Sequence, residues 1–129
     1  MRLWRPTGVA ELRLVRDSGW RRWPPRLPEQ PIFYPVLSFA YAEKIARDWN
    51  AVGHRDGRYG FVTEFEIADA TAARYPAQLA GGQAHRELWV PAEELDAFND
   101  ASLGPIRAIA AYRDRVAYPL AEALREAGL

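Results

Sequence analysis

The sequence predicts a single domain of the α+β class. Its 129 residues suit one hydrophobic core and leave no room for a second. Strand-like and helix-like segments alternate irregularly, and the segments between strands are too short for the crossovers of a doubly wound sheet. The clearest strand, GFVTEFEI at residues 60–67, alternates apolar with partly charged positions, as a half-buried strand does.

The N-terminal part of the chain predicts a strand, a helix and a loop. Leu3 and Trp4 form a short strand that Pro6 ends, because proline cannot donate to a sheet ladder. A helix follows, with Gly19 suited to cap its carboxyl end. Its apolar positions recur at helical spacing: Val9, Leu12 and Val15. Four prolines within residues 20–31 exclude regular structure there.

Two further elements precede the clearest strand. Residues 32–34 predict a short strand, and Ser38 then caps a helix. The residues expected to share one face of this helix are Phe39, Ala42, Ala46 and Trp49. Residues 50–60 are polar and punctuated by glycines, so they predict a loop.

The second half of the chain alternates short strands with helices. The expected strands lie at residues 78–80, before a turn at Gly81 and Gly82, at 86–90 and at 106–112, which is the last. The expected helices cover residues 69–73, a segment that begins at Pro91, and the C-terminal residues 118–129.

Charge and composition exclude several classes of function. Lysine and arginine together number 17, and so do aspartate and glutamate, so no overall field attracts nucleic acid or an anionic membrane. The chain has no cysteine, which excludes disulfides, thiolate metal sites and a cysteine nucleophile. It shows neither a signal peptide nor a run long enough for a membrane helix, so we expect a cytoplasmic protein without membrane contact.

Three polar residues lie within or at the end of strand-like segments that are otherwise apolar: Arg5 in LWRPTG, Tyr34 in PIFYP and Glu87 in HRELWVP. A charged side chain in such a segment is costly to desolvate, so it lies at an exposed strand end or faces a cleft. We therefore expect the strands of Arg5 and Glu87 to be neighbours, or one strand apart, with the three side chains on one cleft.

The segments LWRPTG, PPRLPEQPIFYPVLSFAYAEKIARDW, GFVTEFEI and HRELWVPAEEL resemble a group of small bacterial proteins catalogued under an ADP-ribosylation (ADP-ribosylation/crystallin J1) label. More distantly, residues 3–112 are similar to the ADP-ribosyltransferase fold. The resemblance implies one domain over residues 1–129 with a split antiparallel or mixed sheet and flanking helices. It also implies NAD as a substrate, consumed by ADP-ribosyl transfer to an unknown protein or nucleic-acid acceptor or by hydrolysis.

The resemblance also implies roles for individual residues. Arg5 would meet the phosphates or a ribose of NAD, and Tyr34 would lie against the nicotinamide. Glu87 would be catalytic, holding the ribose 2′-hydroxyl and stabilising an oxocarbenium-like transition state. His85 stands where arginine-specific transferases have Glu or Gln, so the resemblance does not support arginine as the acceptor; we group His85 with the cofactor-binding residues.

Each of these residues also has an alternative interpretation. Arg5 would pair with an acid such as Glu11, Tyr34 would be a core aromatic, and Glu87 would pair with an arginine across the sheet. The protein would then be a non-catalytic module of the same fold that binds a nucleotide, a nucleic acid or a protein. These alternatives are open from the sequence alone.

The proline-rich loop carries arginines interleaved with tryptophans. Arg21, Arg22 and Arg26 are candidate phosphate or substrate contacts, whereas Trp20 and Trp23 are expected to pack the loop onto the core. No metal site is expected, because the polar series Asp48, Asn50, His54 and Asp56 lacks a recognised metal spacing.

Overall fold

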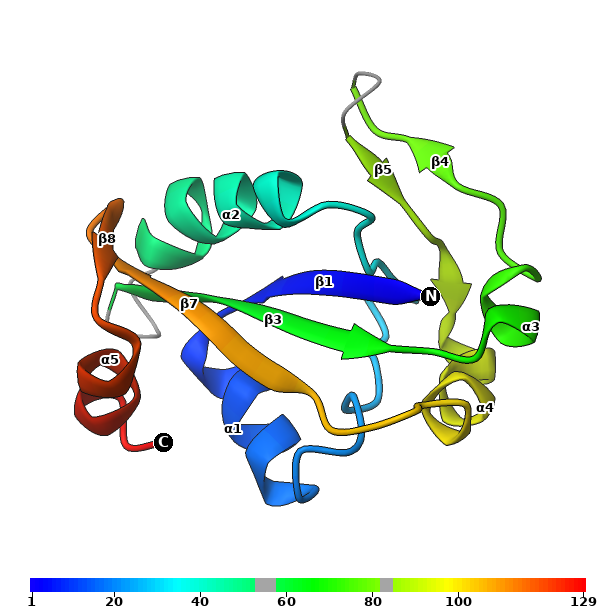
Figure 1. Cartoon of the computed structure of the whole chain (residues 1–129), viewed down its shortest axis with the longest axis horizontal. Coiled ribbons are helices and arrows are strands. Elements are labelled where there is room, and N and C mark those ends of the chain that lie inside the picture. Colours follow the sequence, from blue (N-terminus) through cyan, green and yellow to red (C-terminus); the bar gives the residue numbers. More distant parts are fainter. Residues whose placement is uncertain (53–57, 82–84) are drawn as a thin grey trace.

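The computed structural model describes residues 1–52, 58–81 and 85–129, which form helices and antiparallel sheets (Figure 1). The large sheet has the strand order β1-β3-β7-β8. Its strands are β1 (Arg2–Thr7), β3 (Tyr59–Glu66), β7 (Arg107–Arg113) and β8 (Val116–Tyr118). Smaller sheets pair β2 (Ile32–Phe33) with β6 (Val90–Pro91) and β4 (Gln78–Leu79) with β5 (Arg86–Glu87). The predicted α+β class is therefore confirmed.

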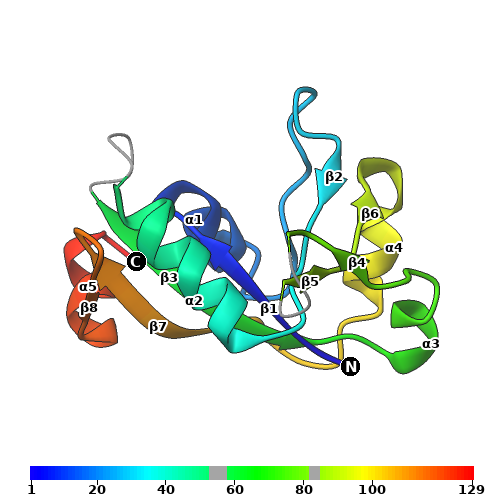
Figure 2. The same ribbon diagram turned by 90° about the horizontal axis from the view of Figure 1, so that it is seen from above.

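Helices cover both faces of the large sheet. The helices of the described residues are α1 (Val9–Asp17), α2 (Phe39–Asp48), α3 (Asp69–Ala72), α4 (Leu95–Asp100), α5 (Leu120–Glu126) and the 3-10 helices η1 (Asn50–Val52) and η2 (Ala92–Glu94). On one face, α1 and α5 pack with Phe61 of β3, and on the other α2 packs with Val62. Figure 2 shows the small sheets, α3 and α4 beside one end of the large sheet.

An extended segment, residues 35–37, connects β1 with β5. Val36 exchanges backbone hydrogen bonds with Trp4 at 3.0 and 2.8 Å. On the other side the Leu88 N–H donates to the Pro35 carbonyl at 2.9 Å, and the Leu37 N–H donates to the Arg86 carbonyl at 3.0 Å. The strands that carry Arg5 and Glu87 therefore lie one extended segment apart, as expected from the sequence.

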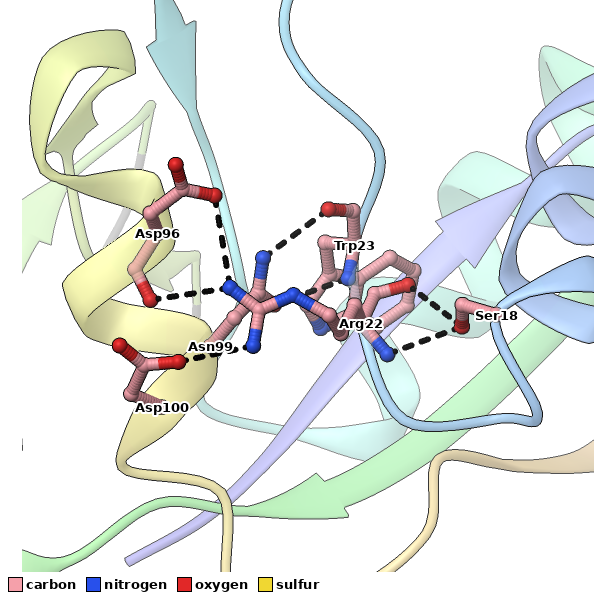
Figure 3. A network of polar contacts seen from close by, with 6 residues as sticks. All are labelled: Ser18, Arg22, Trp23, Asp96, Asn99 and Asp100. Carbon is pink, nitrogen blue, oxygen red and sulfur yellow. Dashed lines mark hydrogen bonds and ion pairs between the residues drawn. The ribbon is translucent and has the colours of Figure 1, made fainter.

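The proline-rich loop is irregular, as predicted, and one end is fixed to α4 (Figure 3). The Trp23 N–H donates to Asn99 Oδ1 at 2.8 Å, and Asn99 Nδ2 donates to the Trp23 carbonyl at 3.0 Å. The Trp23 ring is buried against Phe33 and Phe65. The expectation that this tryptophan packs the loop onto the core is confirmed.

Pro6 does not end the first strand. β1 continues to Thr7, and Pro6 pairs with Val62 of β3. The N–H groups of successive residues point to opposite edges of a strand, so residues two apart point to the same edge. The Trp4 N–H points to Val36. An N–H at Pro6 would point to that same edge, where the only pairing among the described residues is that of Trp4 with Val36, so the proline removes no ladder hydrogen bond.

The predicted strand at residues 86–90 is divided between two sheets. β5 pairs with β4, and β6 pairs with β2, with Leu88 and Trp89 between them. Each pairing is only two residues long, so the exchange of partners leaves no trace in the local pattern of apolar residues.

Residues 106–112 do not form the last strand. β7 is followed by β8, with which it pairs antiparallel. Asp114 and Arg115 form the turn with φ of 50° and 68°. Two left-handed residues suit a tight hairpin, but glycine or asparagine normally marks it in a sequence. The C-terminal helix, predicted over 118–129, begins at Leu120 after this hairpin.

The helix capped by Ser38 is present, since the Ser38 hydroxyl accepts the Tyr41 N–H at 3.1 Å. Ala42 and Ala46 are buried as expected, but Phe39 is partly exposed and Trp49 is 77% exposed. The predicted apolar face is therefore wrong at both ends. The predicted loop over 50–60 contains η1 and the start of β3, and its residues 53–57 lie outside the described residues.

Candidate functional site

A cavity of about 610 Å³ is bordered by β1, the proline-rich loop, α2 and β5. This volume lies within the range of small-molecule sites in proteins, roughly 300–1,000 Å³. Arg5, Tyr34 and Glu87 all line it, although they come from distant parts of the chain. We call it the first cavity.

Arg5 is held by several contacts at once. Its Nε and Nη2 donate to the two carboxylate oxygens of Glu11, each at 2.8 Å. Its Nη1 donates to the Tyr34 carbonyl at 3.2 Å, and its guanidinium lies 4.6 Å from the centre of the Phe33 ring. The pair with Glu11, which was the alternative expected for Arg5, is therefore observed. The same arginine also lines the cavity. The bidentate pair fixes its plane.

Arg26 brings a second guanidinium to the same carboxylate. Its Nη1 lies 3.5 Å from Glu11 Oε1, and its side chain is only 10% exposed. Burial, followed by the nearby charge of Arg5, lowers the pKa of Arg26 from its ordinary value. Two arginines against one carboxylate leave the cluster of Arg5, Arg26 and Glu11 with one positive charge in excess, while Glu29 and Glu87 also line the cavity.

Glu87 brings a carboxylate to the first cavity from β5. Its Oε2 accepts a hydrogen bond from the Tyr41 hydroxyl at 3.0 Å, and its Oε1 accepts one from Trp89 Nε1 at 2.8 Å. Burial and the hydrogen bond to Glu87 raise the pKa of Tyr41 to about 12, so Tyr41 remains a donor at neutral pH. The residue opposite Glu87 in the sheet is Gln78, not an arginine.

Aromatic side chains form the rim of the first cavity. Tyr34 is 38% exposed and lies edge-on to Trp89 with ring centres 6.3 Å apart. Trp49 also lines the cavity and is largely exposed. Phe33, rather than Tyr34, is the buried core aromatic of this segment. Exposed faces of this kind offer stacking surfaces for a planar ring.

His85 lies in a neighbouring cavity of about 320 Å³ instead of the first. Its ring stacks on Tyr41, with centres 4.6 Å apart and planes 11° from parallel. His85 therefore packs against the tyrosine that donates to Glu87, and it does not line the first cavity.

The three loop arginines separate in the structure. Arg26 lines the first cavity, whereas Arg21 and Arg22 do not. Arg22 donates to Asp100 at 2.8 Å and lies 3.4 Å from Asp96, which fixes the loop to α4 (Figure 3). Ser18 supports the same turn by accepting the Arg22 N–H at 3.0 Å.

Sequence reasoning did not identify Tyr41, Trp49 and Trp89 as site residues. Trp89 follows Glu87 by two positions, which in extended chain places both on one side, so this spacing was a usable signal. Tyr41 and Trp49 depend on how α2 packs, which no local pattern indicates.

Within residues 1–52, 58–81 and 85–129, no group of histidine and acidic side chains is arranged to hold a metal ion. His54 and Asp56 of the polar series considered above lie outside those ranges. Nor does any helix in the described ranges have the length and apolar character to cross a membrane.

Comparison with known proteins gives no match. No family model matches the chain, and neither a curated protein nor a solved structure is significantly similar to it. The function must therefore be argued from the site itself.

Proposed function

We propose that the protein consumes NAD in the first cavity, either by transferring ADP-ribose to an acceptor, a protein or a nucleic acid, or by hydrolysing NAD. The observation that supports this most is the meeting of Arg5, Tyr34 and Glu87 on one cavity of suitable volume. The proposal also takes the domain to be a variant of the ADP-ribosyltransferase fold.

The proposed roles follow from the chemistry of the side chains that line the first cavity. The positive wall formed by Arg5 and Arg26 suits the pyrophosphate of NAD. The exposed aromatic rim, Tyr34 included, suits a planar base or the nicotinamide ring. The carboxylate of Glu87 suits a sugar hydroxyl and a developing positive charge.

In the reaction, the bond between the anomeric carbon and the nicotinamide nitrogen breaks, and its electron pair leaves with neutral nicotinamide. The sugar becomes oxocarbenium-like, and Glu87 stabilises this charge. Water or an acceptor nucleophile then attacks the anomeric carbon and loses a proton to solvent. Tyr41 and Trp89 orient the carboxylate by donating to its two oxygens.

The second candidate is a module that binds a nucleotide, a nucleic acid or a protein without catalysis. The observation that favours it is that both oxygens of Glu87 and three nitrogens of Arg5 already have partners within the protein. Groups held in this way are rigid and suit recognition, and their remaining donors and acceptors can still contact a ligand.

Two measurements on the full chain test the proposals. Nicotinamide release from NAD is measured with and without protein and nucleic-acid acceptors, and melting temperatures are measured with NAD, ADP-ribose and nicotinamide. Release of nicotinamide by the purified protein supports catalysis. A rise in melting temperature with NAD or ADP-ribose without any release supports the binding module. If neither release nor a rise in melting temperature is observed, both NAD consumption and binding of these nucleotides are refuted.

A further inference from the structure

A second cavity, of about 500 Å³, shares Arg5 and Arg26 with the first. One part of its lining comes from the end of β1 and the start of α1: Thr7, Gly8 and Ala10. The other part is apolar and consists of Pro24, Pro25, Leu14 and Leu27. It is therefore polar at one end and apolar along its side.

Several polar groups in the lining of the second cavity lack hydrogen-bond partners within the part of the chain that the structure describes. Gly8 occupies the N-cap position of α1 and has no side chain to accept the first helical N–H groups. Thr7 is only 2% exposed, and its Oγ1 has no hydrogen-bond partner among the described residues. Arg26 Nε is also buried and has no hydrogen-bond partner among the described residues. Asn50, which also lines this cavity, has a buried and unpartnered acceptor, Oδ1, on the same described part of the chain. Buried polar groups without partners are costly, so three of them in residues that line one cavity point to an absent polar ligand.

The charge at this end is positive. Among the described residues, Glu11, in the first turn of α1, is the only acidic side chain in the lining of the second cavity, and it faces two arginines. Both of its oxygens are turned to Arg5 at 2.8 Å. The N-terminus of a helix adds about half a positive charge. An anion is therefore the ligand favoured here.

From these observations we infer that the second cavity binds a phosphate group at the N-terminus of α1. A phosphate supplies several acceptor oxygens and about two negative charges, which match the converging donors better than a single carboxylate does. Leu14 and Leu27 are exposed beside the polar end and would contact the organic part of a phosphate ester. The site does not depend on Glu87, which does not line this cavity.

Titration calorimetry of the full chain with inorganic phosphate tests the inference. Arg26→Gln removes a charged donor and should weaken phosphate binding about tenfold to a hundredfold and reduce its salt dependence. Thr7→Val keeps the shape of the side chain but removes the hydroxyl, and should weaken binding about fivefold. Arg21→Gln, an exposed arginine of the same loop that lines neither cavity, should leave binding unchanged.

Three results would overturn the inference. They are no phosphate binding by the wild type, wild-type affinity in both Arg26→Gln and Thr7→Val, or a loss of affinity in Arg21→Gln as large as that in Arg26→Gln. If Arg26→Gln does not fold, Thr7→Val decides alone. A repeat of the titration with saturating NAD identifies the source of the phosphate. Loss of phosphate binding assigns the site to a phosphate of the dinucleotide, and unchanged binding assigns it to a second phosphorylated molecule. Phosphate binding by a protein that releases no nicotinamide supports this site while refuting catalysis.

Discussion

Replacing Glu87 by glutamine separates charge from shape in the first cavity. The structure predicts that the fold tolerates this change, because an amide can satisfy both neighbours of the carboxylate. Trp89 Nε1 can only donate and would be accepted by the amide oxygen, while the amide nitrogen would donate to the Tyr41 oxygen. The free energy of unfolding should therefore change by less than about 1 kcal/mol.

The rate of nicotinamide release should fall much more. A carboxylate about 4 Å from a developing unit charge contributes roughly 4 kcal/mol at the effective dielectric constant of a protein surface. Because Glu87 is only partly buried and the amide keeps a dipole, we expect a loss of roughly 3 kcal/mol, or about a hundredfold in kcat. The affinity for NAD should change little, since the charge acts mainly in the transition state.

The assay measures nicotinamide release and NAD binding side by side in the wild type, Glu87→Gln and Glu93→Gln. Glu93 is an exposed glutamate of η2 outside the first cavity and serves as the matched control. An unchanged kcat in Glu87→Gln would remove the carboxylate from the mechanism. An equal loss in both variants would show that the effect is not specific to the site.

Two further predictions concern positioning and packing. Tyr41→Phe removes the hydroxyl that orients Glu87, so kcat should fall about fivefold at nearly unchanged KM; an unchanged kcat would show that the tyrosine is not a positioning residue. Gly60→Ala would place a Cβ 2.2 Å from the Ala46 carbonyl oxygen, so α2 must move away from β3. We expect a loss of roughly 2–3 kcal/mol and a melting temperature about 10 °C lower. Gly104→Ala, where an added Cβ meets nothing within 4 Å, is the control, and equal melting temperatures for the two variants would contradict the packing argument.

The parts of the fold that follow from local chemistry were predictable. The apolar spacing of Val9, Leu12 and Val15 placed α1, and all three side chains are buried. Ser38 marked the start of α2, and the alternation in GFVTEFEI placed β3. In each case the residue types themselves favour the observed backbone.

The parts that depend on pairing partners were not predictable. Pro6 continues β1 only because that edge of the strand has lost its neighbour, which no local signal shows. The hairpin at Asp114 and Arg115 uses left-handed residues that are not glycine. Trp49 fails the pattern of its helix because it lies beyond the last buried turn of α2 and faces the first cavity.

The candidate site shows why a structural and a functional interpretation of one residue need not compete. Arg5 is paired with Glu11, which the sequence offered as the alternative to ligand binding, yet the pair itself positions the guanidinium on the cavity wall. With a single arginine, the carboxylate would neutralise the wall and leave no attraction for an anion. Arg26 changes this balance, because its guanidinium lies within 3.5 Å of the same carboxylate and is nearly buried. The Arg5–Glu11 pair is rigid, and with Arg26 it holds one excess positive charge between the two cavities. Replacing Arg26, rather than Arg5, should therefore weaken anion binding most while the fold is kept.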